Sequence, residues 1–345
     1  MMRRLLLASL MIGLSAAPVW ALDAVKKVSG QNLSGTIKAI TRDSVEIDKT
    51  SGGAEKVGIL DVESVRFDGE PPQLATVRIK ATNGDFEDAL AQLGRIDPAT
   101  ATKPEVQKEM GFYKAYCTAR LAQAGSGDVN AAGTALNAWL QANQQSFHFY
   151  QGTELVGDLL VKAGSYDGAA AYYGQLDQSP VPEIKMRGGV GAGRSLLAQK
   201  KYPEAQAAFD KVLALTATAK GAMADQQRFA ASLGKASCVA ETGNPDQAIT
   251  AVEEVIKGVS PENAELMAQA YVTIGKAYLV SAKTKPEAKK QALLAFLHVD
   301  TLYSGQPQAH AEALRNLDVL WRDLGKPERA LQAVQLLKDR YSAAQ

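Results

Sequence analysis

The sequence predicts a mainly α-helical protein: an α-solenoid of about six to seven helical hairpins, preceded by a small, barrel-like all-β domain. Two patterns support this prediction. Between positions 33 and 67, apolar and polar residues alternate with period two in short bursts, as in half-buried strands. From position 73 onward, alanine-rich amphipathic segments with turn residues at intervals replace them, as in helical arrays. We therefore expect a β domain at residues 22–72 and a helical array at residues 73–345.

The first 21 residues have the pattern of a secretory signal peptide. A basic start precedes an apolar run, and Val19 and Ala21 precede a candidate cleavage point. An uncleaved membrane anchor is the alternative, but residues 5–21 supply only 17 positions, with Pro18 among them, against the ~20 that a spanning helix needs. We expect cleavage after Ala21, export to the periplasm or the extracellular space, and no stable membrane insertion afterwards.

We expect the β segment to be a meander of four or five short strands. The alternating bursts lie at residues 35–40, 44–48, 56–60 and 64–67, with a Ser-Gly-Gly turn between the second and the third. A sheet this small must bury one face, because an isolated hairpin is marginal in water. The succession of strands resembles a small Sm-like barrel. Two roles are open: a cap that packs on the helical array, or a module that binds a peptide or a glycan.

One six-residue phrase recurs along the helical part of the chain. Most copies begin with glycine, all end with alanine, and an apolar residue stands four positions after each alanine. Each copy therefore marks the turn and the second helix of a hairpin. The five copies occupy residues 84–89, 164–169, 200–205, 243–248 and 325–330. Two weaker units place the corresponding alanine at Ala132 and Ala292.

These units resemble the tetratricopeptide repeat family, in which a small residue of the first helix packs against an alanine of the second. Gly157 with Ala169, and Gly193 with Ala205, reproduce the family's spacing of twelve. Successive alanines are 36 to 44 residues apart, whereas the family's unit has about 34. The resemblance covers residues 73–342 and implies a stack of antiparallel helix pairs. An irregular solenoid of another kind is the alternative.

Composition and motifs argue against several kinds of chemistry. The 345 residues include 38 basic and 37 acidic side chains, a balance that does not favour a nucleic-acid partner. Residues 188–195 approximate a phosphate-binding loop, but they carry arginine in place of lysine and lack a preceding apolar strand. Ser232 and Lys235 match the Ser-x-x-Lys of penicillin-recognising enzymes without the other motifs of those enzymes. We expect no catalytic residue and no cofactor.

The histidines and cysteines predict no metal centre. The three histidines have no paired spacing and no cysteine cluster accompanies them, so a zinc site has no local signature. Cys117 and Cys238 lie about three units apart, whereas a disulfide requires Cα atoms within about 7 Å. We expect two free, buried thiols.

A helical array of this kind offers an extended concave surface lined by the first helix of each unit. Projecting the first helices onto that side selects a face that is acidic early, apolar in the middle and basic at the end. Such a face suits a peptide or protein segment. We expect a non-catalytic protein–protein interaction scaffold of the bacterial cell envelope; the alternative is an envelope hydrolase, or a subunit of one, with an unrecognised site. The selected residues are Glu154, Asp158, Arg194, Leu197, Leu233, Lys276, Leu279, Arg315 and Arg322.

Overall fold

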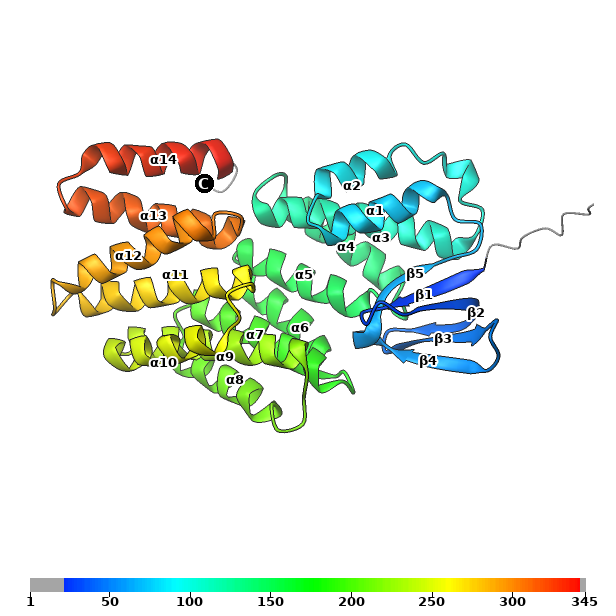
Figure 1. Ribbon diagram of the computed structural model, residues 1–345, viewed down its shortest axis with the longest axis horizontal. Coiled ribbons are helices and arrows are strands. Elements are labelled where there is room, and N and C mark those ends of the chain that lie inside the picture. Colours follow the sequence, from blue (N-terminus) through cyan, green and yellow to red (C-terminus); the bar gives the residue numbers. More distant parts are fainter. Residues whose placement is uncertain (1–21, 342–345) are drawn as a thin grey trace, which may run out of the picture.

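The computed structural model describes residues 22–341, which form a small antiparallel sheet followed by fourteen α-helices (Figure 1). The helices pair into seven hairpins, so the predicted mainly α-helical solenoid behind a β segment is confirmed. The expected signal peptide at residues 1–21 lies outside the described residues. Among the described helices, we find none with the length and hydropathy needed to span a bilayer.

The sheet has five strands in the order β4-β3-β2-β1-β5. They are β1 (Asp23–Lys27), β2 (Asn32–Thr41), β3 (Ser44–Lys49), β4 (Ala54–Gly58) and β5 (Val62–Arg66). Strand β1 precedes the region in which we expected strands, yet it lies inside the sheet and pairs with both β2 and β5. Its two buried residues, Ala24 and Val25, are adjacent, so it lacks the alternation that marks the other strands.

Strand β2 changes partner at Gly35. Residues 32–35 pair with β1, and residues 35–41 pair with β3. A Cβ atom at Gly35 would lie 2.8 Å from the carbonyl carbon of Asp48, and closer still to its oxygen. Glycine therefore allows the two strands to approach closely where the sheet changes partner. A short 3-10 turn (Ile59–Asp61) then carries the chain from β4 to β5 at the opposite edge.

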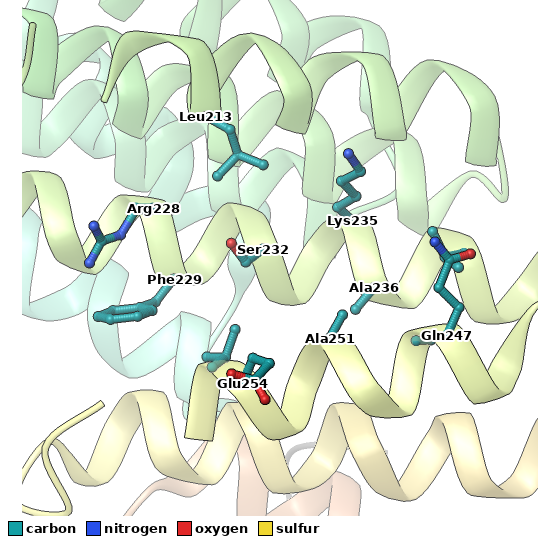
Figure 2. Close-up of a pocket in the computed structure, with 12 residues that line it drawn as sticks. Leu213, Arg228, Phe229, Ser232, Lys235, Ala236, Gln247, Ala251 and Glu254 are labelled. Atoms are coloured by element: carbon teal, nitrogen blue, oxygen red, sulfur yellow. The ribbon is translucent and has the colours of Figure 1, made fainter. Parts of the chain in front are cut away.

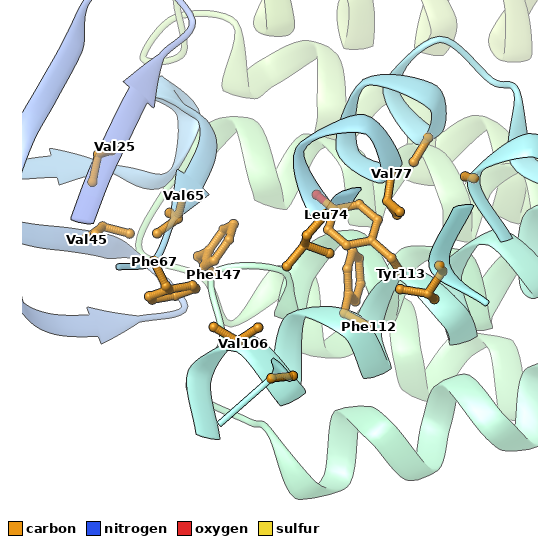
Figure 3. Packing of buried hydrophobic residues seen from close by; sticks show 14 of the residues in the cluster. Val25, Val45, Val65, Phe67, Leu74, Val77, Val106, Phe112, Tyr113 and Phe147 are labelled. Carbon is orange, nitrogen blue, oxygen red and sulfur yellow. The ribbon is translucent and has the colours of Figure 1, made fainter. Parts of the chain in front are cut away.

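The sheet and the first helices share one hydrophobic core (Figure 3). Val45 and Val65 of the sheet and Phe67 belong to the same buried cluster as Phe112 and Phe147 of the helical part. A buried interface of this kind fixes the sheet against the first hairpins, as expected for a packing cap.

The seven hairpins stack in chain order. They are α1 (Pro72–Thr82) with α2 (Phe86–Leu93), α3 (Pro104–Ala124) with α4 (Val129–Ala142), α5 (Phe149–Lys162) with α6 (Tyr166–Asp177), α7 (Pro182–Ala198) with α8 (Tyr202–Leu215), α9 (Ala222–Glu241) with α10 (Pro245–Gly258), α11 (Ala264–Ser281) with α12 (Ala288–Leu302), and α13 (Pro307–Asp323) with α14 (Pro327–Tyr341). First helices of adjacent hairpins pack on each other, as α7 does on α9 and α9 on α11. The array therefore curves with its first helices on the inside.

Every alanine selected from the repeat is buried in its second helix. None is more than 3% exposed, because each faces the first helix of its own hairpin or a neighbouring one. The positions are Ala89, Ala132, Ala169, Ala205, Ala248, Ala292 and Ala330.

Several glycines of the first helices lie against an aromatic ring of a second helix. Tyr173 on α6 lies between Gly157 of α5 and Gly191 of α7, and each glycine's added Cβ would overlap its ring. Phe209 on α8 lies in the same way between Gly193 of α7 and Gly234 of α9. The rings stand four positions after the alanines, one turn along the same helix face. The ring therefore fills the space that the glycines leave.

Candidate functional site

The acidic residues early on the concave face are held by the protein's own side chains. Glu154 on α5 forms an ion pair with Arg187 on α7, whose Nε donates over 2.8 Å. Asp158, one turn later, accepts hydrogen bonds from the Tyr173 hydroxyl at 2.8 Å and from the Gln123 amide at 3.1 Å. Burial, followed by the charge of Glu154, raises the pKa of Asp158. These carboxylates link neighbouring hairpins: Arg187 neutralises Glu154, and the positive charge of Arg194 acts on Asp158.

Arg194 on α7 lies at the middle of the concave face. Its side chain is exposed, and Nη2 donates to the amide oxygen of Gln269 on α11 over 3.5 Å. Helix α9 packs against both α7 and α11, so this contact crosses it and joins the fourth hairpin to the sixth.

Two of the basic residues predicted for the late part of the face form ion pairs. Lys276 on α11 donates to Glu312 on α13 over 2.9 Å. Arg322 pairs with Asp318 one turn earlier on α13, with Nε 2.7 Å from the carboxylate. Both pairs are exposed, and such pairs are typically worth less than about 1 kcal/mol. A ligand carboxylate can compete for these cations at small cost.

Arg315 on α13 is exposed, and its charge acts across the groove. Lys162, the last residue of α5, donates to the carbonyl oxygens of Ala122 and Gln123 at the end of α3, over 3.2 and 2.7 Å. Burial, followed by the positive charge of Arg315, lowers the pKa of Lys162. The seventh hairpin therefore faces the third across the groove, and Figure 1 shows the C-terminal hairpin curling back toward α5.

The three leucines predicted for the concave face lie largely beneath its surface. Leu233 is only 4% exposed and belongs to the core around α9, α10 and α11. Leu197 and Leu279 are half-buried against neighbouring hydrophobic clusters. The basic members of the predicted set are longer and exposed, so their ends reach the groove while the leucines support the helix packing.

A separate cleft of about 430 Å³ lies between α8, α9 and α10 (Figure 2). Its wall includes Leu213 from α8 and Phe229 from α9, and it also contains Ser232 and Lys235. The Lys235 ammonium pairs with Asp210 at 2.6 Å, so the Ser-x-x-Lys lysine is engaged with a carboxylate. Sequence analysis identified these two residues but gave no signal for the cleft, which forms only when three helices pack.

The glycine-rich residues 188–195 lie within helix α7. Gly193 lies against the Phe209 ring of its own hairpin, Gly191 against the Tyr173 ring of the preceding one, and Gly188 against the Tyr173 backbone and Leu176. A phosphate-binding loop needs free backbone amides between a strand and a helix. Here the amides belong to the helix, so the glycines serve packing.

A buried polar cluster that the sequence did not indicate joins the segment after β5 to α1, α3 and the start of α5. Arg78 on α1 donates to both carboxylate oxygens of Glu70, over 2.6 and 2.8 Å, and approaches Glu109 on α3 at 3.5 Å. Glu109 in turn contacts the imidazole of His148 at 2.9 Å. Glu109 and His148 lie far along the chain from the other two residues, so no local pattern relates the four.

The remaining histidines and cysteines have structural contacts. Buried His310 lies between Asp300, at 2.9 Å, and the Tyr341 hydroxyl, at 2.7 Å. Burial raises the pKa of Cys117 to about 12 and, offset by a backbone hydrogen bond, that of Cys238 to about 11; both are free thiols. Residues 22–341 contain no group of three or more His, Cys, Asp or Glu side chains arranged to hold a metal ion.

Comparison with known proteins identifies the fold. No protein-family model matches this chain, and no curated protein matches it. Among solved structures, a Rap protein complexed with competence and sporulation factor is 13% identical, with a TM-score of 0.52 over 79% of this chain and 76% of that one. A tetratricopeptide repeat protein from Parabacteroides merdae is 16% identical, with a TM-score of 0.50 over 79% of this chain and 96% of that one. At these identities the likeness shows a tetratricopeptide-like fold.

Proposed function

We propose that this chain is a non-catalytic scaffold that binds a peptide or protein segment in the concave groove of its helical array, in the bacterial cell envelope. The main observation is the groove itself. First helices of the third, fourth, sixth and seventh hairpins present charged side chains to one curved surface, where Arg194 reaches Gln269 across α9. Extended concave surfaces of this kind suit chain-like partners.

Two further observations support the proposal. A Rap protein with a similar fold is complexed with a factor, so this kind of array is compatible with partner binding. The apolar run and the residues Val19 and Ala21 favour export. If the chain is exported by signal cleavage, N-terminal sequencing of the secreted material begins at Leu22; a chain that still begins at Met1 contradicts export.

Site-specific photo-crosslinking in envelope fractions tests partner binding. A photoreactive residue at Val319, which is 58% exposed on α13, samples the predicted concave face. The same residue at Lys257, an exposed position on second helix α10, is the control. We expect a defined protein to be captured from position 319 and not from position 257. Equal capture from both positions, or turnover of an envelope polymer by the purified protein, contradicts the scaffold.

A further inference from the structure

The last described helix lacks the cover that the other second helices have. Helix α8 packs on α9, α10 on α11 and α12 on α13, so each is covered by the first helix of the next hairpin. Within residues 22–341, no helix follows α14. The difference shows four positions after the repeat alanine, where Val334 on α14 is partly exposed and its counterparts in the earlier hairpins are no more than 8% exposed. The counterparts are Leu93, Leu136, Tyr173, Phe209, Val252 and Phe296.

Leu331 lies one turn before Val334 on the same side of α14, and its side chain is 62% exposed. The residues at the same repeat position of α10 and α12 are Ile249 and Leu293, which are partly buried against clusters that include residues of the next hairpin. Terminal units of a helical stack usually present a polar outer face. Helix α14 instead keeps the apolar side chains that meet a neighbouring helix elsewhere in the array. We call Leu331, Val334 and Lys338, which follow each other at helical spacing, the end face.

The end face has opposite charges at its two ends. Glu328 lies in the first turn of α14 and Lys338 in the last, and both are exposed. A second α14 that crosses the first one antiparallel at Val334 brings Glu328 of each copy toward the partner's Lys338. A parallel crossing brings like charges together instead, which is repulsive. Antiparallel packing also places each helix N-terminus beside the partner's C-terminus, as the helix dipoles favour. The end face is therefore complementary to a second copy of itself.

The other end of the array already has an apolar partner within the chain. Leu74 and Val77 of α1 are buried in the same core as Val65 of the sheet and Phe67 (Figure 3). Figure 1 shows α14 at the edge of the array that lies away from the sheet. Two identical C-terminal ends are therefore the surfaces that match. Such ends meet about a two-fold axis and close into a dimer, whereas a head-to-tail contact risks an open filament.

We propose that the end face of α14 binds a second copy of this chain, with the two α14 helices antiparallel around Val334. Burial of Leu331 and Val334 at the interface drives association. The two pairs between Glu328 and the partner's Lys338 set the orientation. The end face belongs to a second helix and the concave groove to the first helices, so this inference is independent of the proposed function.

Sedimentation velocity of the purified protein alone tests the proposal. We expect a reversible monomer–dimer equilibrium with a dissociation constant of about 1–100 µM. Leu331→Glu should raise this constant at least about 10-fold, because each dimer would bury two unpaired carboxylates. The matched control is Leu294→Glu: Leu294 on α12 is 60% exposed and lies outside the end face, so the dimer should be unchanged.

A charge swap tests the antiparallel orientation. Glu328→Lys and Lys338→Glu should each raise the dissociation constant about 3-fold or more, because each variant brings like charges together twice in a dimer. The double variant Glu328→Lys/Lys338→Glu restores opposite charges and should associate nearly as tightly as the parent. All these positions are exposed, and thermal melts identify any variant that fails to fold.

Four results would overturn the inference. A parent protein that stays monomeric up to about 500 µM refutes self-association. Equal effects of Leu331→Glu and Leu294→Glu refute the end face, and a double variant no better than the single reversals refutes the antiparallel orientation. Assemblies that keep growing beyond the dimer refute the two-fold contact. No groove partner takes part in these measurements, so the proposed scaffold stands or fails separately.

Discussion

Replacement of Gly234 by alanine should destabilise the array, although alanine is the better helix former. In Gly234→Ala the new Cβ would lie within 2.5 Å of three ring atoms of Phe209, whereas carbon atoms prefer about 3.5–4.0 Å. The other side of the ring lies against Gly193, where even an added Cβ would fall within 2.8 Å of three ring atoms, so a retreat would press the ring onto the α7 backbone. Overpacking of this kind costs about 1–3 kcal/mol, and the gain in helix propensity returns about 1 kcal/mol. We expect a net loss of up to about 2 kcal/mol.

Urea denaturation followed by circular dichroism at 222 nm measures this loss. The matched control is Gly174→Ala on α6, where an added Cβ meets no atom within 4 Å; stability should rise by up to about 1 kcal/mol. Phe209→Leu in the Gly234→Ala background should recover part of the loss, since the smaller side chain leaves room for the methyl group. If Gly234→Ala is as stable as the parent, the ring does not fill the space between the two glycines.

Two other properties of the fold can be tested directly. Glu70→Gln removes the carboxylate that binds buried Arg78 through both oxygens and leaves only Glu109, at 3.5 Å; it should cost about 3 kcal/mol in thermal or urea melts. Glu63→Gln, in an exposed pair, should change stability by no more than about 0.5 kcal/mol, and equal effects would refute the buried cluster. Burial raises the pKa of Cys117 to about 12 and, offset by a backbone hydrogen bond, that of Cys238 to about 11. Both buried thiols should therefore react with a maleimide at pH 7 only after unfolding. Rapid labelling of the native protein would contradict their burial.

Local chemistry accounts for the features that the sequence predicted well. Each repeat phrase begins where the chain leaves one helix, and Gly84, Gly164, Gly243 and Gly325 all adopt positive φ, between 68° and 100°. Glycine reaches this conformation without steric penalty, so the glycine at the start of each phrase marks the turn in the sequence. Lys200 fills the same place in the remaining copy, with φ 60°, because the hairpin around it imposes the turn. The alanines that follow are buried because helix periodicity, which is also local, sets which face meets the partner helix.

Contacts that skip a hairpin depend on the tertiary structure alone. Repeat spacing defines which helices are neighbours, but the curvature of the stack is the sum of small rotations at every interface. This curvature brings Arg194 to Gln269 and brings the charge of Arg315 close enough to lower the pKa of Lys162. It also decides that the three predicted leucines lie beneath the groove surface while charged side chains reach it. By itself, the sequence determined the hairpins and their order, because those follow from local periodicity; the contacts across the groove were decided only when seven hairpins packed.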